Sequence, residues 1–352
     1  MTEAPAIATP AWPPDWPRAH GAPLAPGDYR AAAEDFLVEE CLGFEPEGQG
    51  EHLWLWVEKR DLTTVELARR LARACDVSPR DIGYAGMKDR LAVTRQWLSV
   101  HLPGREAPAD LETRLGDTPA RVLAISRHPR KLKRGVHRGN RFRLRIGGAV
   151  VDHPGLAERW AVLCREGVPN YFGPQRFGPE GRNLFRACGI LARGWRKRDD
   201  RQGVLLSCAR SYLFNELLAR RLRQGDWPRA VPGDVMMLDG TRSQFVADTV
   251  DDPLRSRIAR LDVHPTGVLW GEGRSVAADD AAAYERWLVE THPGLCAALT
   301  RSGVRLARRA LRVAPTEASL EVVDDGVVLG FALPRGAFAT AVLRELIAHP
   351  TL

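Results

Sequence analysis

The chain has 352 residues, of which 44% are hydrophobic and 27% charged. This length predicts two or three domains, or one large domain with an insertion, and the composition excludes disordered, collagen-like and low-complexity proteins. The longest apolar runs, such as Gly326 to Leu333, are shorter than the roughly 18 residues of a membrane helix, and no export signal is readable. We therefore expect a globular protein of the cytoplasm that does not span a membrane.

The six cysteines lie far apart and include no C-x-x-C pair. A chain of this length does not need disulfides to fold, so free thiols are the better interpretation. The same spacing argues against structural zinc, and no H-E-x-x-H or EF-hand pattern occurs. We expect no metal.

The first half of the chain predicts strands and one helix. Residues 1–28 are rich in proline, alanine and tryptophan and predict an irregular arm laid over the surface. Residues 35–44 and 51–59 have the composition and partial alternation of strands, and we expect them to be adjacent. Thr63 and Glu66 form a capping box that predicts a helix as far as residue 75. A loop and a further strand are expected over 83–100.

Residues 127–145 carry nine arginines or lysines and no acid, which favours a nucleic-acid surface over a solvated strand pair. The pattern predicts two strands around a basic loop. In the second strand, Phe142, Leu144 and Ile146 alternate with arginines, so one side packs while the other faces solvent or phosphate. The expected RNA contacts are Lys88, Arg90, Arg130, Lys131, Lys133 and Arg134.

The second half of the chain begins with a predicted helix near 154–166. The aromatic, glycine-rich segment 168–183 follows it and fits a buried junction better than an RNA-stacking platform. Arginine-rich helices such as 211–224 come next. The arginines between Arg301 and Arg312 are expected on a helix that either lines a basic cleft or is solvated. The tail predicts a hairpin across Asp325-Gly326, followed by a helix over 336–348.

The densest group of reactive residue types is Gly83 to Arg90, with the sequence GYAGMKDR. Lys88 and Arg90 flank Asp89, so its carboxylate is expected to stay ionised and to act as a nucleophile or a general base. The glycine spacing does not fit a P-loop. The plainer interpretation is a loop aspartate that forms a salt bridge or a turn.

Six segments, in order and spacing, resemble the tRNA pseudouridine synthase D (TruD) family. The most specific is the long N-Y-F-G-x-Q-R-F-G block, followed by G-x-K-D. Ala33 departs from the proline that is common in the family, which loosens a turn but removes no functional group. The segments are Ala33–Glu40, Gly50–Leu53, Ala85–Arg90 with Ala92, Thr94 and Gln96, Gly139–Phe142, Pro169–Gly178 and Leu333–Thr340.

The resemblance implies isomerisation of a tRNA uridine, at position 13 of the D arm, to pseudouridine without cofactor, metal or ATP. It also implies an α+β fold with a mostly antiparallel sheet, flanking helices and a large inserted α/β domain. The catalytic domain is expected over 1–166 and 310–352, and the inserted domain over 167–309. tRNA is the expected partner, and a monomer is favoured.

The resemblance also assigns roles to individual residues. Asp89 matches the catalytic aspartate of the family, and a carboxylate in a pocket with little water needs a basic partner to stay ionised. Arg30, just before the first matching segment, is ranked first as this partner, and Lys88 and Arg90 are local alternatives.

A stacked uridine must leave its helix to react, so the pocket needs aromatic walls. Phe142 matches the phenylalanine that stacks on uracil, and Asn140, two residues earlier on the same side of the strand, can bond polar groups of the uridine. Phe36 and Phe338 resemble residues that line the pocket. The competing interpretation is that the phenylalanines are core residues and the asparagine belongs to a turn.

Two other functions fit part of the pattern. A non-catalytic RNA-binding protein would use the same basic groove and release no product. A nucleoside or glycoside hydrolase would use Glu39, Glu40 or Glu51 as a second carboxylate and release free uracil.

Overall fold

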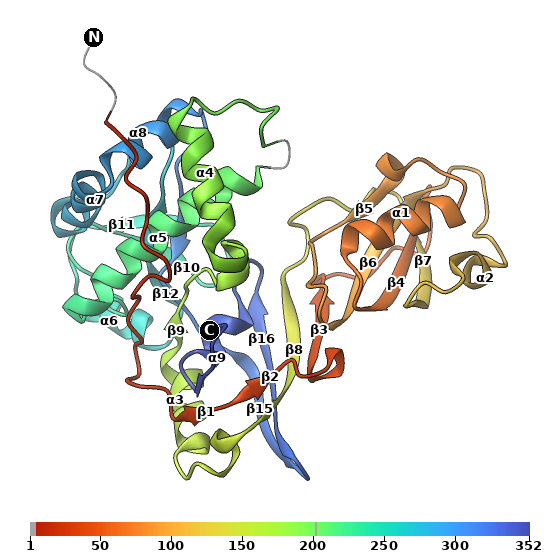
Figure 1. Ribbon diagram of the computed structural model, residues 1–352, viewed down its shortest axis with the longest axis horizontal. Helices are drawn as coiled ribbons and strands as arrows, with labels where there is room; N and C mark the ends of the chain where they lie inside the picture. The colour runs from red at the N-terminus through yellow and green to blue at the C-terminus, as the bar shows by residue number, and fades with distance from the viewer. Residues whose placement is uncertain (1–4, 201–202) are drawn as a thin grey trace. The chain divides into compact units, whose positions relative to one another are not determined.

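The computed structural model describes residues 5–200 and 203–352 and divides the chain into two compact units. The sheet unit comprises Ala25–Ala157 and Pro315–Gly336, and the helical unit comprises Glu158–Ala314, Ala337–Leu352 and the segment that ends at Leu24 (Figure 1). Compactness does not show which part carries an activity. The predicted catalytic domain, 1–166 with 310–352, and the inserted domain, 167–309, therefore stay predictions.

The sheet unit is built on a nine-stranded sheet with β15 and β7 at the ends of its main path. Two short strands lie off this path: β2 (Asp28–Tyr29) pairs with β8, and β5 (Ile82–Tyr84) pairs with β6. Within the described chain the pairs are antiparallel except for β3 with β6, so the predicted α+β fold with a mostly antiparallel sheet is confirmed. The order along the path is β15 (Thr316–Val323), β16 (Gly326–Pro334), β8 (Gly139–Gly147), β3 (Phe36–Cys41), β6 (Val93–His101), β4 (His52–Arg60) and β7 (Ala120–His128).

Strands β3 and β4 form where the sequence predicts them, but the prediction that they are adjacent is wrong. Strand β6 lies between them, parallel to β3 and antiparallel to β4. A parallel pair needs a long crossover connection, which the chain between β3 and β6 supplies with helix α1 (Thr64–Ala74). The predicted hairpin is confirmed as β15 and β16, where Val323 is opposite Gly326.

Helix α1 begins with the predicted capping box. The Thr63 hydroxyl accepts a hydrogen bond from the Glu66 amide at 3.1 Å, and the Glu66 carboxylate accepts one from the Thr63 amide at 3.2 Å. On its buried face, Leu67 and Leu71 pack with the inward side chains of β4 and β6 and with those of the short helix α2 (Leu111–Leu115). Helix α1 thereby covers the sheet beside the loop that follows β5 (Figure 1).

The helical unit places its helices around a four-stranded antiparallel sheet. The sheet order is β11 (Gln244–Ala247), β10 (Asp234–Leu238), β12 (Val263–Leu269) and β13 (Ala307–Ala310). The long helix α5 (Val204–Gln224) supplies much of the main core. The other helices are α3 (Leu156–Glu166), α4 (Arg182–Ala192), α6 (Asp252–Ala259), α7 (Asp279–Thr291), α8 (Pro293–Arg301) and α9 (Ala339–Leu343), and the remaining short strands of the chain are β1 (Ala25–Pro26), β9 (Val168–Pro169), β14 (Arg312–Val313) and β17 (Ile347–Ala348).

The aromatic segment 168–183 is part of this core. Tyr171 and Phe177 are 2% and 0% exposed, so they form no open stacking platform. The N-terminal segment packs onto them, with the Trp16 and Tyr171 rings stacked at 5.7 Å and the Trp16 indole donating to Glu216 at 2.7 Å. For the described residues, the predicted arm over the surface is confirmed.

The prediction that a helix carries the arginines after Arg301 is wrong. Arg308 and Arg309 lie on β13, and Arg312 lies on β14. Arg308 pairs with Glu285, while Arg309 donates to the Asn170 carbonyl at 3.1 Å. These guanidinium groups therefore donate to buried acceptors and do not line an open cleft. The predicted helix over 336–348 is reduced to α9.

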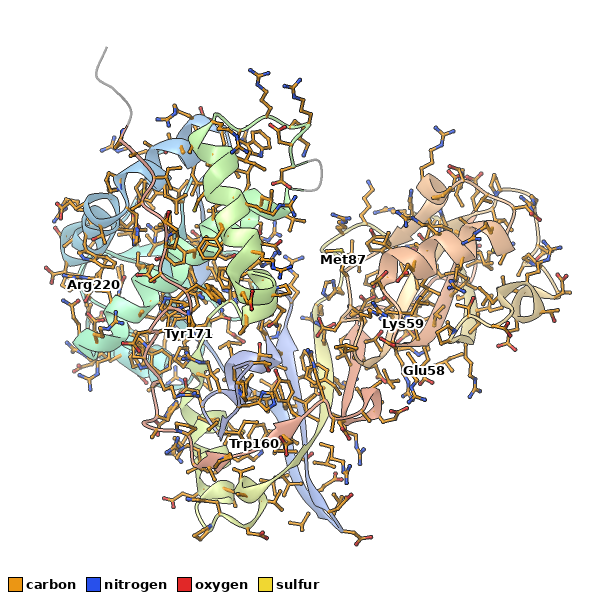
Figure 2. All side chains as sticks on the ribbon, viewed as in Figure 1. Glu58, Lys59, Met87, Trp160, Tyr171 and Arg220 are labelled. Atoms are coloured by element: carbon orange, nitrogen blue, oxygen red, sulfur yellow. The ribbon has the colours of Figure 1, made fainter. Side chains whose placement is uncertain are left out.

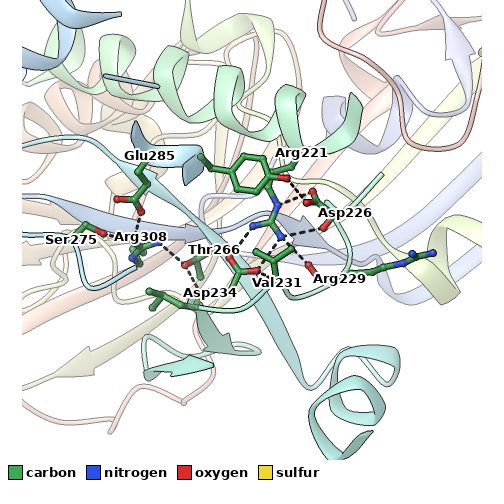
Figure 3. A network of polar contacts seen from close by, with 11 residues as sticks. Arg221, Asp226, Arg229, Val231, Asp234, Thr266, Ser275, Glu285 and Arg308 are labelled. Atoms are coloured by element: carbon green, nitrogen blue, oxygen red, sulfur yellow. Dashed lines mark hydrogen bonds and ion pairs between the residues drawn. The ribbon is translucent and has the colours of Figure 1, made fainter. Parts of the chain in front are cut away.

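A second buried network joins α5 to β10 (Figure 3). The Arg221 side chain is 1% exposed and forms two hydrogen bonds with the Asp234 carboxylate, at 2.8 and 3.0 Å. It also bonds the Asp226 carboxylate at 3.0 Å and the Arg229 carbonyl at 2.9 Å. Each guanidinium nitrogen therefore has a partner, as a buried charge requires.

Candidate active site

Asp89 lies in the irregular segment between β5 and β6. Its Oδ2 atom accepts a hydrogen bond from Nη2 of Arg30 at 2.5 Å, and the Asp89 and Arg30 side chains are 39% and 19% exposed. The basic residue ranked first from the sequence is thus the one that contacts Asp89. The carboxylate has a cationic partner and remains accessible.

Arg30 is held in an unusual conformation. It follows β2 with a φ of 61°, in the left-handed region that residues other than glycine adopt rarely. Its guanidinium carbon lies 3.7 Å from the centre of the Phe36 ring, a cation–π arrangement. The Nε atom is buried without a hydrogen-bond partner among the described residues. Strain and unmet bonding of this kind concentrate at functional sites.

The two alternative partners of Asp89 are engaged elsewhere. Lys88 Nζ is 2.6 Å from Glu40 Oε2, and both side chains are almost fully buried. Burial raises the pKa of Glu40, and the Lys88 ammonium group opposes that shift. This burial and pairing oppose the RNA contact predicted for Lys88, which stays a prediction. Arg90 pairs with Asp61 at 3.2 Å and is exposed, so its RNA contact stays a prediction.

The candidate uracil-stacking residue lies in an aromatic row. Phe142 is 8% exposed, with ring centres 6.2 Å from Phe36 and 5.4 Å from Phe331, the latter stacked. Asn140 faces Glu40 across the pair of β8 and β3, and its buried Oδ1 atom has no partner in the described structure. An unmatched buried acceptor is costly unless a ligand donor completes it. The stacking and binding roles stay predictions.

Phe338 belongs to the helical unit. Its ring is 5.8 Å from the Phe172 ring, and the Arg176 guanidinium group lies 5.7 Å from its centre. Phe338 thus packs at the edge of a hydrophobic core, as the competing interpretation expects. Its part in a uridine pocket stays a prediction.

The basic segment separates into a free loop and a neutralised strand. In the loop before β8, Arg130 and Lys133 are exposed and have no ion pair with any described residue, while Arg134 donates to the Tyr84 hydroxyl at 3.1 Å. Lys131 donates to the carbonyl of Arg80. These four residues remain the expected RNA contacts.

The outward arginines of β8 face solvent, as predicted, but carboxylates lie beside them. Arg141 pairs with Glu317 at 2.6 Å, and Arg143 lies 3.8 Å from Glu321, both on β15. Arg145 pairs with Asp325 in the turn of the hairpin. The neighbouring hairpin supplies the acids that residues 127–145 lack. The alternation of β8 is therefore confirmed, but its arginines are not an unpaired row of positive charge.

Lys59 is a residue of the site that the sequence did not reveal. It is 0% exposed, and its Nζ atom donates to the Asp89 carbonyl at 2.8 Å. Burial lowers the pKa of Lys59 to about 8, against the opposing effect of the Asp89 charge. A signal was present, because the alternation of β4 puts Lys59 on the same buried face as Leu55 and Val57.

An accessible carboxylate whose guanidinium partner lies over an aromatic ring, in the same unit as an unmatched buried amide, fits an enzyme that acts on a nucleotide. The family model described as "tRNA pseudouridine synthase D (TruD)" matches residues 20–194 and 200–346. The chain therefore belongs to the tRNA pseudouridine synthase D family.

Individual relatives agree with this membership. The chain is 60% identical over 345 residues to tRNA pseudouridine synthase D of Chromohalobacter salexigens, covering 98% of this chain and 99% of that one. It is 48% identical to the protein of the same name in Pseudomonas entomophila, with 94% of each covered. A crystal structure described as a candidate TruD of Methanosarcina mazei aligns with a TM-score of 0.63 at 22% identity, covering 95% and 94%, which supports the fold.

Proposed function

We propose that the protein isomerises a uridine of tRNA to pseudouridine, at position 13 of the D arm, with Asp89 as the catalytic carboxylate. The contact between Arg30 and Asp89 at 2.5 Å carries the proposal. It pairs the one acidic residue of the G-x-K-D segment with a cation while leaving the carboxylate accessible. A protein acting on tRNA is expected in the cytoplasm, and a monomer suffices because these two residues come from one chain.

The proposed reaction needs no external reactant. The bond from ribose C1′ to uracil N1 breaks, the uracil rotates, and a bond forms from C1′ to C5. The proton of C5 is lost and N1 gains one, so the atoms balance. An ionised carboxylate next to the sugar serves this reaction as a nucleophile towards ribose or base, or as the base that removes a proton.

Asn140 and Phe142 would hold the extruded base. The unmatched Asn140 Oδ1 can accept an N–H of uracil or a hydroxyl of ribose. The row of Phe36, Phe142 and Phe331 offers an aromatic edge against which a uracil can rest.

Two of the three carboxylates considered for the hydrolase alternative are paired with cations. Glu40 is bound to Lys88 at 2.6 Å, and Glu39 lies 3.4 Å from Arg95. Glu51 is mostly exposed and lies 3.6 Å from His101. A glycosidase needs two carboxyl groups flanking the scissile bond, and these partners oppose that role.

Mass spectrometry of an unmodified tRNA transcript after incubation separates the three functions. We expect unchanged tRNA mass, no free uracil, and one carbodiimide-reactive nucleoside in the D arm. Free uracil would favour the hydrolase. Binding without a new nucleoside would favour the non-catalytic RNA-binding protein.

A further inference from the structure

The loop that carries Asp89 is fixed from beneath by side chains of three elements. The Gly86 carbonyl accepts a hydrogen bond from Gln96 of β6 at 3.2 Å. The Lys88 amide donates to the Thr64 hydroxyl of α1 at 2.9 Å. The Asp89 carbonyl accepts the bond from Lys59 of β4. Side chains therefore bond the backbone groups of this irregular segment, as a neighbouring strand does in a sheet.

Lys59 differs from the other anchors because it is a buried cation without a counter-ion. No carboxylate of the described residues lies within ion-pair distance of its ammonium group, and the carbonyl of Asp89 is its one hydrogen-bond acceptor there. A buried ammonium group is costly, and an apolar side chain of similar shape is often as stable or more so. Folding alone thus does not explain a lysine at this position.

The place of the Lys59 bond points to the reacting group. The acceptor is the main-chain carbonyl of the residue whose carboxylate contacts Arg30. Arg30, just after β2, holds the side chain of Asp89, and Lys59 of β4 holds its backbone. Movement of either would turn the carboxylate away from its substrate, and small misplacements at reacting groups are expensive in rate.

We propose that Lys59 is a positioning residue: its buried ammonium group locks the Asp89 backbone so that the carboxylate points at the ribose and base of the bound uridine. The inference rests on the proposed function. Lys59 contacts no substrate in this role and acts through Asp89.

Charged groups around Lys59 determine how its effect depends on pH. The Asp89 and Asp61 charges favour the ammonium form, and Lys88 opposes it. Lys59 also borders a cavity of about 530 Å³ whose charged lining residues are Glu34, Glu58, Arg60 and Arg121. Since the pKa of Lys59 is lowered to about 8, its charge is present at neutral pH and lost as the pH rises above 8.

The test replaces Lys59 by methionine, which keeps the length of the side chain and removes the charge and the donor. We expect kcat for pseudouridine formation to fall about 100-fold. The KM for tRNA should not rise, and the melting temperature at pH 7 should not fall. In the wild type, kcat should decline above about pH 8, and this decline should be absent from K59M. The matched control is R60M. Arg60 is an exposed cation on the same strand as Lys59 and pairs with Glu34, so its loss should leave kcat unchanged.

A second variant keeps the inference testable if K59M does not fold. T64V removes the acceptor for the Lys88 amide without changing a charge, and we expect kcat to fall about 10-fold with KM unchanged and the decline above pH 8 retained. Wild-type kcat in K59M, or in T64V if only that variant folds, would overturn the inference while leaving the proposed function intact. A wild-type protein that forms no pseudouridine would instead remove the proposed function itself.

Discussion

Two polar networks of this protein, one around Arg221 and one around Asp89, differ in how completely they are satisfied. Around Arg221 in the helical unit, each guanidinium nitrogen has an acceptor and both aspartates are bound (Figure 3). In the sheet unit, Lys59, which bonds the Asp89 backbone, lacks a carboxylate, and Asn140 of β8 lacks a donor among the described residues. Native proteins satisfy most buried polar groups, so the incomplete network is the better candidate for binding a ligand.

Exposure adds to the contrast at the Asp89 loop. Met87 and Leu91, before and after Asp89 in the chain, are 58% and 63% exposed, whereas Lys59, which bonds the backbone between them, is fully buried. Met87 and Lys59 are labelled in Figure 2. The loop is therefore held on its inner side and open on its outer side, as a reacting segment must be.

The largest expected effect is on the satisfied network. Replacing Arg221 by methionine leaves the buried Asp234 and the partly buried Asp226 carboxylates without their cation, and we expect a loss of about 3–5 kcal/mol in the free energy of unfolding. Denaturant titration measures it. Stability within about 1 kcal/mol of the wild type would mean that this network is not what holds α5 to β10.

The next effect is on the incomplete network. Replacing Arg30 by methionine removes the cation from Asp89, and we expect kcat to fall about 100-fold while the melting temperature changes little, because the pair is partly exposed. Arg90 offers the matched control, since it is a neighbouring cation that pairs with Asp61. Its methionine variant should weaken tRNA binding and spare kcat. Equal loss of kcat in both variants would contradict the assignment of Arg30.

A smaller effect is expected from the aromatic row. In Phe142→Leu the apolar volume is nearly kept but the ring is lost, so kcat should fall roughly 10-fold, in keeping with the worth of an aromatic contact, while the Kd for tRNA is unchanged. Single-turnover kinetics and filter binding separate the two quantities. A higher Kd for tRNA with unchanged kcat would favour the interpretation of Phe142 as a core residue.

The smallest effect is expected at the neutralised strand. Arg141 and Glu317 are both more than half exposed, so Arg141→Gln should change the free energy of unfolding by less than about 1 kcal/mol. Its effect on tRNA affinity should also be slight compared with that of Lys133→Gln in the free loop. A larger loss of tRNA affinity in Arg141→Gln than in Lys133→Gln would instead indicate that the arginines of β8 bind phosphate.

Local patterns predicted local structure well in this chain. The capping box of Thr63 and Glu66, the alternation of β8 and the hairpin at Asp325-Gly326 are all formed. The order of strands was not predictable in the same way, because β6 is inserted between β3 and β4 by pairings that no local pattern encodes.

The candidate site was predictable only in part, for the same reason. The candidate catalytic carboxylate and its pairing with Arg30 were predicted from motif resemblance, but Lys88 is buried against Glu40, and Arg309 donates to Asn170. Charge density along a sequence does not show which partners the fold will bring. Lys59 was not predicted, although its inward position on β4 is a conflict between local pattern and residue type that indicates function.

The most direct test of the account is single-turnover pseudouridine formation by Asp89→Asn at saturating protein. We expect tRNA to bind with wild-type affinity and no pseudouridine to form, because asparagine keeps the shape of the side chain but neither ionises nor attacks. Pseudouridine at a rate near that of the wild type would contradict the central role of this carboxylate.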